Sequence, residues 1–406
     1  MQPNQSNGKR VARVKKLLIL NGSHSDIPLI QAGKKLGYHV ITTGNIPELL
    51  GHRYADEYHP ADFSDCDAIL DLAKRLRIDA ICACANDFGA ITAAYVAEAM
   101  GLPGHDSYEV ALTIHHKDRF KRFSSDNALT TPRAKIHATP DFAFTDGSRF
   151  FFPLMVKPID LTGGKGITKV ASPEDLSVAI RKAFSASRAR RIVIEEFVEG
   201  SLHSFSSFIV DGRIVFYFCD NEFSYINPFL VSTSAAPAVG IDRVVDQLRE
   251  QLEGVASRLS LVDGILHAQY ILKGDTAWII EITRRCSGDF YPNPVNLSCG
   301  LDWAEWIVKA ETGADCAGFP RARQQGYYGR HCIMSHANGV VEDIAIDERI
   351  RPNIHGSFMM WKPGHRVSDF MVDKLGIVFL RYDSMDEMME RTTDLNRLIR
   401  VRLREN

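Results

Sequence analysis

Lys157 and the turn Gly163-Gly164-Lys165-Gly166 are the residues whose types and spacing point most directly to chemistry. The apolar run that begins at Phe151 predicts a buried strand, and a second strand is expected to begin at Ile167. Glycine lets backbone N–H groups approach phosphate oxygens without a Cβ in the way, while a strand lysine supplies a point charge to the same anion. The segment therefore predicts a nucleotide phosphate site, with a flexible hairpin loop as the alternative.

Four other segments carry chemistry-bearing side chains in a fixed order around that turn. They are HHKDRFKRF with Lys117, the stretch Ile192–Ser201 with its paired acids, His203, and the stretch Trp278–Cys286 with a glutamate and two arginines. Cations suit anionic phosphates, and carboxylates suit a Mg²⁺ ion that bridges them. Because any one such motif recurs by chance, the shared order carries the weight.

Alternating apolar strands and helices must position the first of these groups, and they predict a small α/β domain over residues 15–112. Its expected elements are strands at Lys16–Leu20, Tyr38–Thr42 and Ala80–Cys84 and helices at Pro28–Leu36, Asp65–Leu76 and Phe88–Met100. The domain lacks the GxGxxG fingerprint of dinucleotide binding. After Pro132 hairpins mix with helices, and helices are expected from Ser172, over Asp246–Leu259 and over Ser384–Leu398.

Length and composition restrict the class of protein. The chain has 406 residues, a length that predicts two or three packed domains. The charges of its 48 basic and 50 acidic residues nearly cancel, so neither nucleic acid nor an anionic membrane is implied as a partner. The apolar stretches are too short to span a membrane and the start is polar, which predicts a cytoplasmic protein. Eight scattered cysteines are expected to be reduced, with Cys82 and Cys84 in the core.

The five segments in their order resemble the ATP-grasp superfamily. The pattern is most similar to its branch with a preceding α/β domain, which includes biotin carboxylase, the phosphoribosylaminoimidazole carboxylase ATPase subunit, and amino-acid and dipeptide ligases. The resemblance implies a mixed α/β and α+β chain in which a Rossmann-like domain precedes the ATP-grasp fold. The implied division is a disordered lead-in (1–14), the α/β domain (15–112), the ATP-grasp domain (113–315) and a C-terminal α+β region packed on it (316–406).

The resemblance assigns nucleotide contacts residue by residue. Lys117 and Lys157 match the two phosphate lysines, although a solvated helix-start lysine is the alternative for Lys117. The expected nucleotide-binding set is Lys117, Lys157, Gly163, Gly164, Gly166, Glu195, Glu196, Val198 and His203, in which the hinge 195–198 contacts adenine. His203 either contacts ribose or is a packing residue, and Lys165 either touches phosphate or only solvates the turn.

The metal-binding motif departs from the family pattern. The family supplies an acid on one strand and Glu-x-Asn-x-Arg on the next, whereas this chain has Gln269 and then Glu281, with Thr283 in place of asparagine. Only Glu281 carries a formal charge, so Mg²⁺, or Mn²⁺ in its place, is expected to bind weakly unless substrate phosphates dominate. This departure leaves open a nucleotide-binding protein with weak or no catalysis.

Three further residues are implied near the reaction itself. Arg285 matches the arginine that steadies the acyl-phosphate and the species after it, while Arg284 points to the other face and is expected to form a salt bridge. Asp289 either orients or deprotonates a nucleophile, or only forms a turn after Gly288. Arg285, Lys157 and Asp289 are the expected catalytic residues.

The turn after the first expected strand has two interpretations. Ser23, His24 and Ser25 either touch a second substrate at the carboxyl edge of the sheet or cap the following helix. The resemblance implies an ATP-dependent ligase that joins a small carboxylate to an amine through an acyl-phosphate, with release of ADP and phosphate. A bicarbonate-activating carboxylase is the enzymatic alternative, and a homodimer is expected by analogy.

Overall fold

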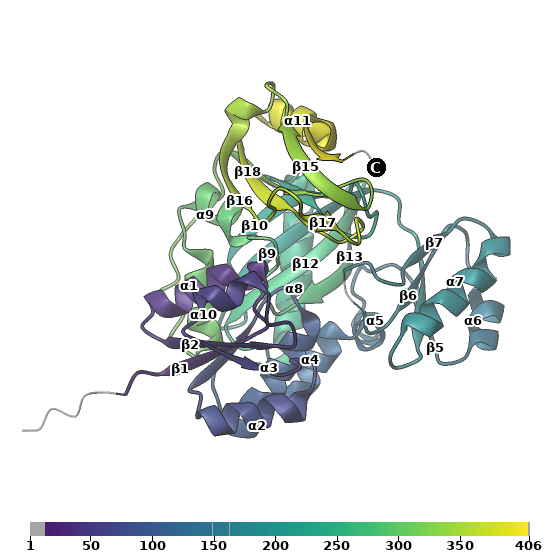
Figure 1. The fold of residues 1–406 in the computed structure, drawn as a ribbon. Coiled ribbons are helices and arrows are strands. Elements are labelled where there is room, and N and C mark those ends of the chain that lie inside the picture. Colours follow the sequence, from purple (N-terminus) through teal and green to yellow (C-terminus); the bar gives the residue numbers. More distant parts are fainter. Residues whose placement is uncertain (1–12, 148, 162, 405–406) are drawn as a thin grey trace, which may run out of the picture.

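The structure is a computed structural model that describes residues 13–147, 149–161 and 163–404, so most of the expected lead-in lies outside the described residues. The N-terminal domain is a parallel sheet in the order β3-β2-β1-β4 (Figure 1). Its elements are β1 (Lys16–Leu20), α1 (Ile27–Lys35), β2 (His39–Gly44), β3 (Glu57–Pro60), α2 (Cys66–Leu76), β4 (Ala80–Ala83) and α3 (Asp87–Met100).

Local sequence explains where these elements begin and end. The side chain of Asn86 accepts hydrogen bonds from the backbone N–H groups of Phe88 and Gly89 at the start of α3, and Gly101 ends that helix with φ +66°. Leu17 to Leu20 are buried, as a strand covered on both faces requires. The expected strands and helices of this domain are confirmed. Strand β3 was not predicted, because its sequence has no strong alternation of apolar and polar residues.

Two helices, α4 (Tyr108–His115) and α5 (Lys117–Asp126), connect this domain to a small antiparallel sheet in the order β5-β8-β6-β7. The small sheet and its helices project to one side of the molecule (Figure 1). Their bounds are β5 (Ala134–His137), α6 (Pro140–Gly147), β6 (Leu154–Pro158), β7 (Thr168–Val170), α7 (Pro173–Ala186) and β8 (Ile192–Glu196). Leu176, Ala179 and Ile180 of α7 pack on this sheet, as their helical spacing predicts.

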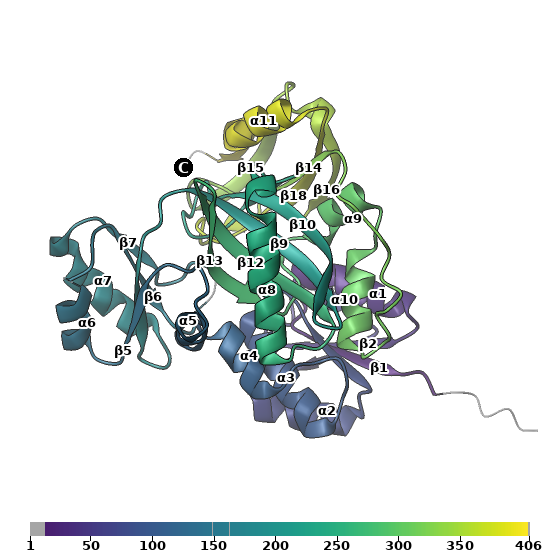
Figure 2. The same ribbon diagram turned by 180° about the vertical axis from the view of Figure 1, so that it is seen from behind.

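The centre of the molecule is an antiparallel sheet of eight strands in the order β13-β12-β9-β10-β11-β14-β18-β16. Helix α8 lies across one face of it, as seen from behind in Figure 2. The elements are β9 (Ser201–Val210), β10 (Arg213–Phe223), β11 (Thr233–Ala236), α8 (Val245–Leu259), β12 (Gly264–Lys273), β13 (Thr276–Thr283), α9 (Pro292–Cys299), α10 (Trp303–Glu311), β14 (Tyr327–Ile333), β16 (Ile354–Met359) and β18 (Gly376–Tyr382).

The C-terminal residues add a three-stranded sheet and a helix. These are β15 (Gly339–Ile346), β17 (Arg366–Val367), β19 (Ile399–Leu403) and α11 (Met385–Leu398). Because β14, β16 and β18 belong to the central sheet, that sheet runs across the boundary expected between residues 315 and 316. The C-terminal region therefore extends the core by strand pairing and does not only pack against it.

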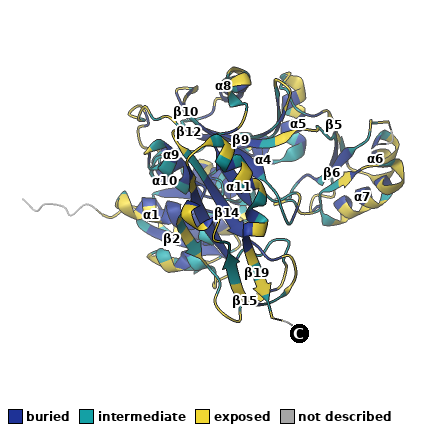
Figure 3. Cartoon of the chain, turned by 90° about the horizontal axis from the view of Figure 1, so that it is seen from above, coloured by how far each residue is buried: buried dark blue, intermediate teal, exposed yellow. Residues whose placement is uncertain are grey.

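Burial concentrates where the domains meet around the central sheet (Figure 3). Cys82 and Cys84 are fully buried in the core there, as expected, and all eight cysteines are free thiols. Along β9 and β12 the apolar residues Phe205 and Ala268 face α8. The alternating polar residues must then face the opposite side. No helix among the described residues is long and apolar enough to cross a membrane.

Candidate active site

One cavity brings together five of the predicted site residues. It lies where α4 and α5 meet β6, β8 and β13, and its walls include the predicted Lys117, Lys157, Glu195, Glu281 and Thr283. The two lysines lie on α5 and β6 and the two glutamates on β8 and β13, so these four residues become neighbours only when the chain folds. The cavity also contains three polar residues that sequence reasoning missed, namely Asp87, His115 and Lys121.

Glu195 is the electrostatic centre of one wall. Its carboxylate forms ion pairs with Lys157 and, at 2.9 Å, with Lys121. Burial alone would raise the pKa of Glu195, but Lys121 and Lys157 lower it to about 2, so this carboxylate is ionised at neutral pH. Lys121 follows Lys117 by four residues on α5, so both lysines lie on one face of the helix. This spacing is the sequence signal from which Lys121 could have been predicted.

Lys117 contacts the backbone of the segment that leads into the glycine turn. The Lys117 Nζ donates to the carbonyl of Leu161 at 2.7 Å, just before the turn. Gly163, Gly164 and Gly166 have φ of +65°, +75° and +72°, which only glycine adopts without strain. A Cβ on Gly164 would also lie 2.6 Å from the Cβ of Phe229, so the turn packs closely on the loop after β10. Lys165 is exposed.

The hinge residues Glu196 and Val198 lie at the end of β8 and in the connection to β9. The Glu196 carboxylate accepts a hydrogen bond from Arg133 Nε at 2.8 Å, and that of Glu195 binds lysines, so both acid side chains already have protein partners. A side-chain contact of either acid with adenine stays a prediction. Backbone contacts of the hinge with adenine stay a prediction.

His203 lies inside the sheet on β9. Its Nε2 is 2.6 Å from the Ser201 hydroxyl, its ring stacks on Tyr270 at 5.2 Å, and it does not line the cavity described above. Burial lowers the pKa of His203 to about 4, so the ring is neutral. These contacts favour the packing alternative, and the ribose contact stays a prediction.

The predicted metal ligands lie on neighbouring strands. Gln269 of β12 is the cross-strand partner of Glu281 on β13, and the buried Thr283 hydroxyl has no protein partner. The Gln269 side-chain amide donates to the Glu222 carboxylate of β10 at 2.6 Å. Glu222 is therefore a buried acid near the expected metal position that sequence reasoning missed, because it lies on a strand outside the motif. Among the described residues, no three His, Cys, Asp or Glu side chains form a metal-binding group.

Arg285 is fixed by the N-terminal domain. Its Nε donates to Asp87 Oδ1 at 2.9 Å, and the same oxygen lies 3.1 Å from His115 Nδ1. Burial would raise the pKa of Asp87, but Arg285 first and then His115 hold it well below its usual range. The neighbouring Arg284 forms an ion pair with Asp106 at 2.7 Å, which confirms the salt bridge expected for it.

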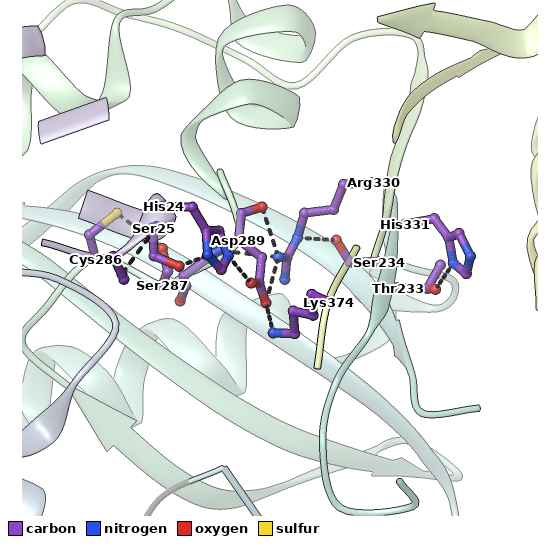
Figure 4. Close-up of polar contacts among 12 residues, drawn as sticks. His24, Ser25, Thr233, Ser234, Cys286, Ser287, Asp289, Arg330, His331 and Lys374 are labelled. Carbon is purple, nitrogen blue, oxygen red and sulfur yellow. Dashed lines mark hydrogen bonds and ion pairs between the residues drawn. The ribbon is translucent and has the colours of Figure 1, made fainter. Parts of the chain in front are cut away.

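Asp289 joins three parts of the chain (Figure 4). Its carboxylate lies 3.0 Å from His24 Nε2 and 2.5 Å from Lys374 Nζ, and Arg330 Nη1 lies 3.6 Å from it. Against the effect of burial, Lys374, His24 and Arg330 hold the pKa of Asp289 well below its ordinary value. So stable an anion accepts protons poorly, which argues against the expected base role. Its φ of +56° agrees with the expected turn.

The turn after β1 caps a helix, which was one of its two interpretations, and its contact with a second substrate stays a prediction. Ser23 caps the short helix His24–Asp26, with Asp26 closing a capping box. Ser25 Oγ accepts a hydrogen bond from the backbone N–H of Asp289 at 2.9 Å, and His24 contacts the Asp289 carboxylate. The turn therefore docks the N-terminal domain on the cluster of Asp289, Arg330 and Lys374, beyond its capping role.

His267 is a further buried histidine, on β12 beside Tyr291. The His267 Nδ1 is 2.6 Å from the hydroxyl of Ser206. Burial first, and then the cations of Arg285 and Arg330, lower the pKa of His267 to about 3. The His267 ring also packs edge-on against the Tyr291 ring at 5.6 Å, and the Arg330 guanidinium lies 5.3 Å from the centre of that same Tyr291 ring.

Comparisons with known proteins agree with this architecture. The L-amino acid ligase of Bacillus licheniformis superposes with a TM-score of 0.80 at 19% identity, covering 97% of this chain and 100% of that one. The phosphoribosylglycinamide synthetase of Anaerococcus prevotii gives 0.75 at 18% identity, covering 97% and 100%. The chain has the ATP-grasp fold. The biotin carboxylase domain dimer of the Hydrogenobacter thermophilus 2-oxoglutarate carboxylase, solved with MgADP and bicarbonate, gives 0.74 at 16% identity, covering 96% and 91%.

Sequence comparisons cover a smaller part of the chain. The family model described as the D-ala D-ala ligase C-terminus matches residues 128–205, which include Lys157, the glycine turn and the hinge. The large chain of carbamoyl phosphate synthase from Deinococcus radiodurans is 25% identical over 285 residues. That match covers 65% of this ATP-grasp chain and 26% of the relative, so the chain spans about a quarter of the curated relative's length.

Proposed function

We propose that this protein is an ATP-dependent ligase that joins a small carboxylate to an amine and releases ADP and phosphate. The observation that carries the proposal is the shared cavity of Lys117, Lys157 and Glu281. Two cations and one acid from three elements converge there, which is what the triphosphate of a nucleotide and its metal ion require. The similar proteins of known structure include ligases and carboxylases, which supports the same reading.

The cationic residues have separate roles in this proposal. Lys157 and Lys117 hold phosphate oxygens, and the Gly163–Gly166 turn offers backbone N–H groups and closes over them as a lid. Lys117 already contacts the backbone carbonyl of Leu161, two residues before the turn. A closed pocket matters because water competes with the amine for an acyl-phosphate.

The donors around Glu281 fit Mg²⁺, or Mn²⁺ in its place. The carboxylate of Glu281, the unpartnered hydroxyl of Thr283 and the amide oxygen of Gln269 are all oxygen ligands, which this ion prefers. When bound, the ion neutralises charge on the transferring phosphoryl group. Because one formal charge among three donors binds a bare ion weakly, these residues would hold the metal mainly together with nucleotide phosphates.

The reacting groups meet on the polar face of the central sheet. Arg285, held by Asp87, is proposed to stabilise the acyl-phosphate and the oxyanion that the amine creates. Arg330 and Lys374 surround Asp289 with more positive than negative charge. This cluster is proposed to orient the second substrate, with Asp289 as a positioning residue.

A hydroxylamine assay tests the function. Purified protein is incubated with ATP, Mg²⁺, hydroxylamine and a panel of small carboxylates, and hydroxamate and ADP are measured. Hydroxamate formed with equal ADP supports the ligase. ATP hydrolysis that depends on bicarbonate indicates the carboxylase, and nucleotide binding without turnover indicates a binding protein. Sedimentation of the same sample tests the predicted homodimer.

A further inference from the structure

His115 is a buried histidine with one ring nitrogen unused by the protein. It ends α4, two residues before Lys117, and its side chain is 1% exposed. The Nδ1 atom lies 3.1 Å from Asp87 Oδ1, whereas the buried Nε2 has no hydrogen-bond partner. A buried polar atom without a partner costs free energy, so it needs an explanation.

The surroundings of His115 indicate what the free nitrogen faces. Its ring lines the cavity that holds Lys117, Lys157 and Glu281. A second histidine, the half-buried His105, lines the neighbouring cavity and uses its Nε2 to contact the Ile81 carbonyl at 2.9 Å. His105 is thus satisfied by the protein, whereas His115 Nε2 has no partner, and His115 lines both the His105 cavity and the cavity proposed for the nucleotide phosphates.

Asp87 determines the chemistry of the ring. A carboxylate only accepts hydrogen bonds, so His115 Nδ1 carries a proton and donates it to Asp87. Asp87 also accepts from Arg285 Nε, so the same oxygen orients both side chains. Because Arg285 is proposed to act at the reacting phosphoryl group, the shared contact with Asp87 places His115 with the groups of the transfer step.

We propose that His115 is an additional catalytic residue, whose Nε2–H donates to an oxygen of the γ-phosphoryl group of ATP, with Asp87 as its positioning residue. The proposal rests on the proposed function above. A P–O bond forms from the substrate carboxylate while the bond from phosphorus to the β–γ bridging oxygen breaks. ADP leaves with that electron pair, and His115 keeps its proton. Donation from Nε2 requires protons on both ring nitrogens, and the Asp87 carboxylate lies 3.1 Å from the other one.

Two substitutions separate this role from a structural one. Asparagine in His115→Asn can keep the contact that Nδ1 makes with Asp87 but has no group at the Nε2 position. Glutamine in His115→Gln places an amide near the Nε2 position and gives up the Nδ1 contact. A matched control is His137→Asn, because His137 on β5 is also buried with an unpartnered Nε2 but does not line this cavity.

The readout is the affinity for ADP and for a non-hydrolysable ATP analogue with its γ-phosphate, measured calorimetrically with Mg²⁺. We expect His115→Asn to bind ADP as wild type does but to lose about tenfold in affinity for the analogue, the effect of one charged hydrogen bond. His115→Gln should recover part of that loss, and His137→Asn should lose nothing. Thermal unfolding of each variant verifies that it is folded.

Three results would overturn the inference. They are an unchanged analogue affinity in His115→Asn, an equal loss for ADP and the analogue, and a greater loss in His115→Gln than in His115→Asn. If wild type binds both nucleotides and forms hydroxamate while His115→Asn behaves like wild type, only the role of His115 fails. If wild type binds neither nucleotide, the proposed function fails and the inference fails with it.

Discussion

Lys374 Nζ lies 2.5 Å from Asp289 Oδ2, which joins the loop before β18 to the segment that follows β13. The same carboxylate contacts His24 of the N-terminal domain, so one anion connects residues 265 positions apart in sequence. Because the pair is buried, each charge depends on its partner. Asp289 is therefore a structural junction of the molecule as well as a neighbour of the proposed reaction.

Removing this anion should destabilise the whole chain. Asp289→Asn leaves Lys374 and Arg330 buried without their counter-charge, and we expect the free energy of unfolding to fall by about 3 kcal/mol or more. Urea denaturation followed by circular dichroism measures it. Asp275→Asn is the control, since the Asp275 side chain is 78% exposed and its ion pair with Arg243 should contribute little. Equal stability of the two variants would show that the junction is not stabilising.

Glu195 should make stability depend on acid pH. Its pKa is lowered from 4.5 to about 2 in the folded protein, so ionised Glu195 stabilises the fold above about pH 4.5, and this contribution is lost as pH falls from 4.5 toward 2. The difference in unfolding free energy between wild type and Glu195→Gln should therefore shrink across that window. Glu196→Gln, which loses a pair with the exposed Arg133, is the control. A gap that stays constant from pH 7 to pH 3 would contradict this assignment.

Periodicity and capping signals were enough to place most helices and strands. Alternating apolar runs identified β1, β2 and β4, and helix α3 ends at Gly101 as the glycine predicts. The eight-stranded sheet could not be predicted, because the pairing of β11 with β14 joins residues about one hundred positions apart with no local signal. Long-range strand pairing is decided by packing of the complete chain.

Site residues that belong to a local sequence motif could be predicted. Site residues that only the folded chain brings together could not. Lys117, Lys157 and Glu281 were assigned through the resemblance to the ATP-grasp superfamily, and they line one cavity. Asp87, His115 and Glu222 were missed because a lone polar residue in a helix or strand gives no pattern until its neighbours in space are known. The hinge position of Glu195 was predicted, but the pairing of its carboxylate with Lys121 was not.

Two adjacent glycines should respond differently to the same substitution. Gly163→Ala places a Cβ at φ +65° in open space, whereas Gly164→Ala at φ +75° also drives a Cβ to 2.6 Å from Phe229. We expect Gly163→Ala to weaken ADP binding only slightly and Gly164→Ala to weaken it about tenfold, because the turn must shift away from the phosphates. Fluorescence titration with ADP and Mg²⁺ measures both. Equal affinities would mean that the turn does not contact phosphate.

Glu281 should control metal binding through its formal charge. Glu281→Gln keeps the size of the side chain but removes the only charge of the predicted ligand set, and we expect Mn²⁺ to bind about tenfold more weakly in the presence of ADP. The electron paramagnetic resonance signal of free Mn²⁺ reports this directly, without catalysis. Glu250→Gln, at an exposed position of α8, should leave the titration unchanged. Unaltered Mn²⁺ affinity in Glu281→Gln would place the metal elsewhere.

Arg285 should affect turnover more than nucleotide affinity. Its proposed partner is the charge that develops during reaction, so Arg285→Lys, which keeps a cation but loses the planar donor fork, should lower kcat about a hundredfold while ADP affinity changes little. Arg284→Lys is a control one residue away, because Arg284 binds Asp106 and the Val262 carbonyl. If Arg285→Lys lost nucleotide affinity and turnover equally, Arg285 would contribute to binding in the ground state. The hydrogen bond from Arg285 to Asp87 would then be an anchor between the domains with no part in the reaction.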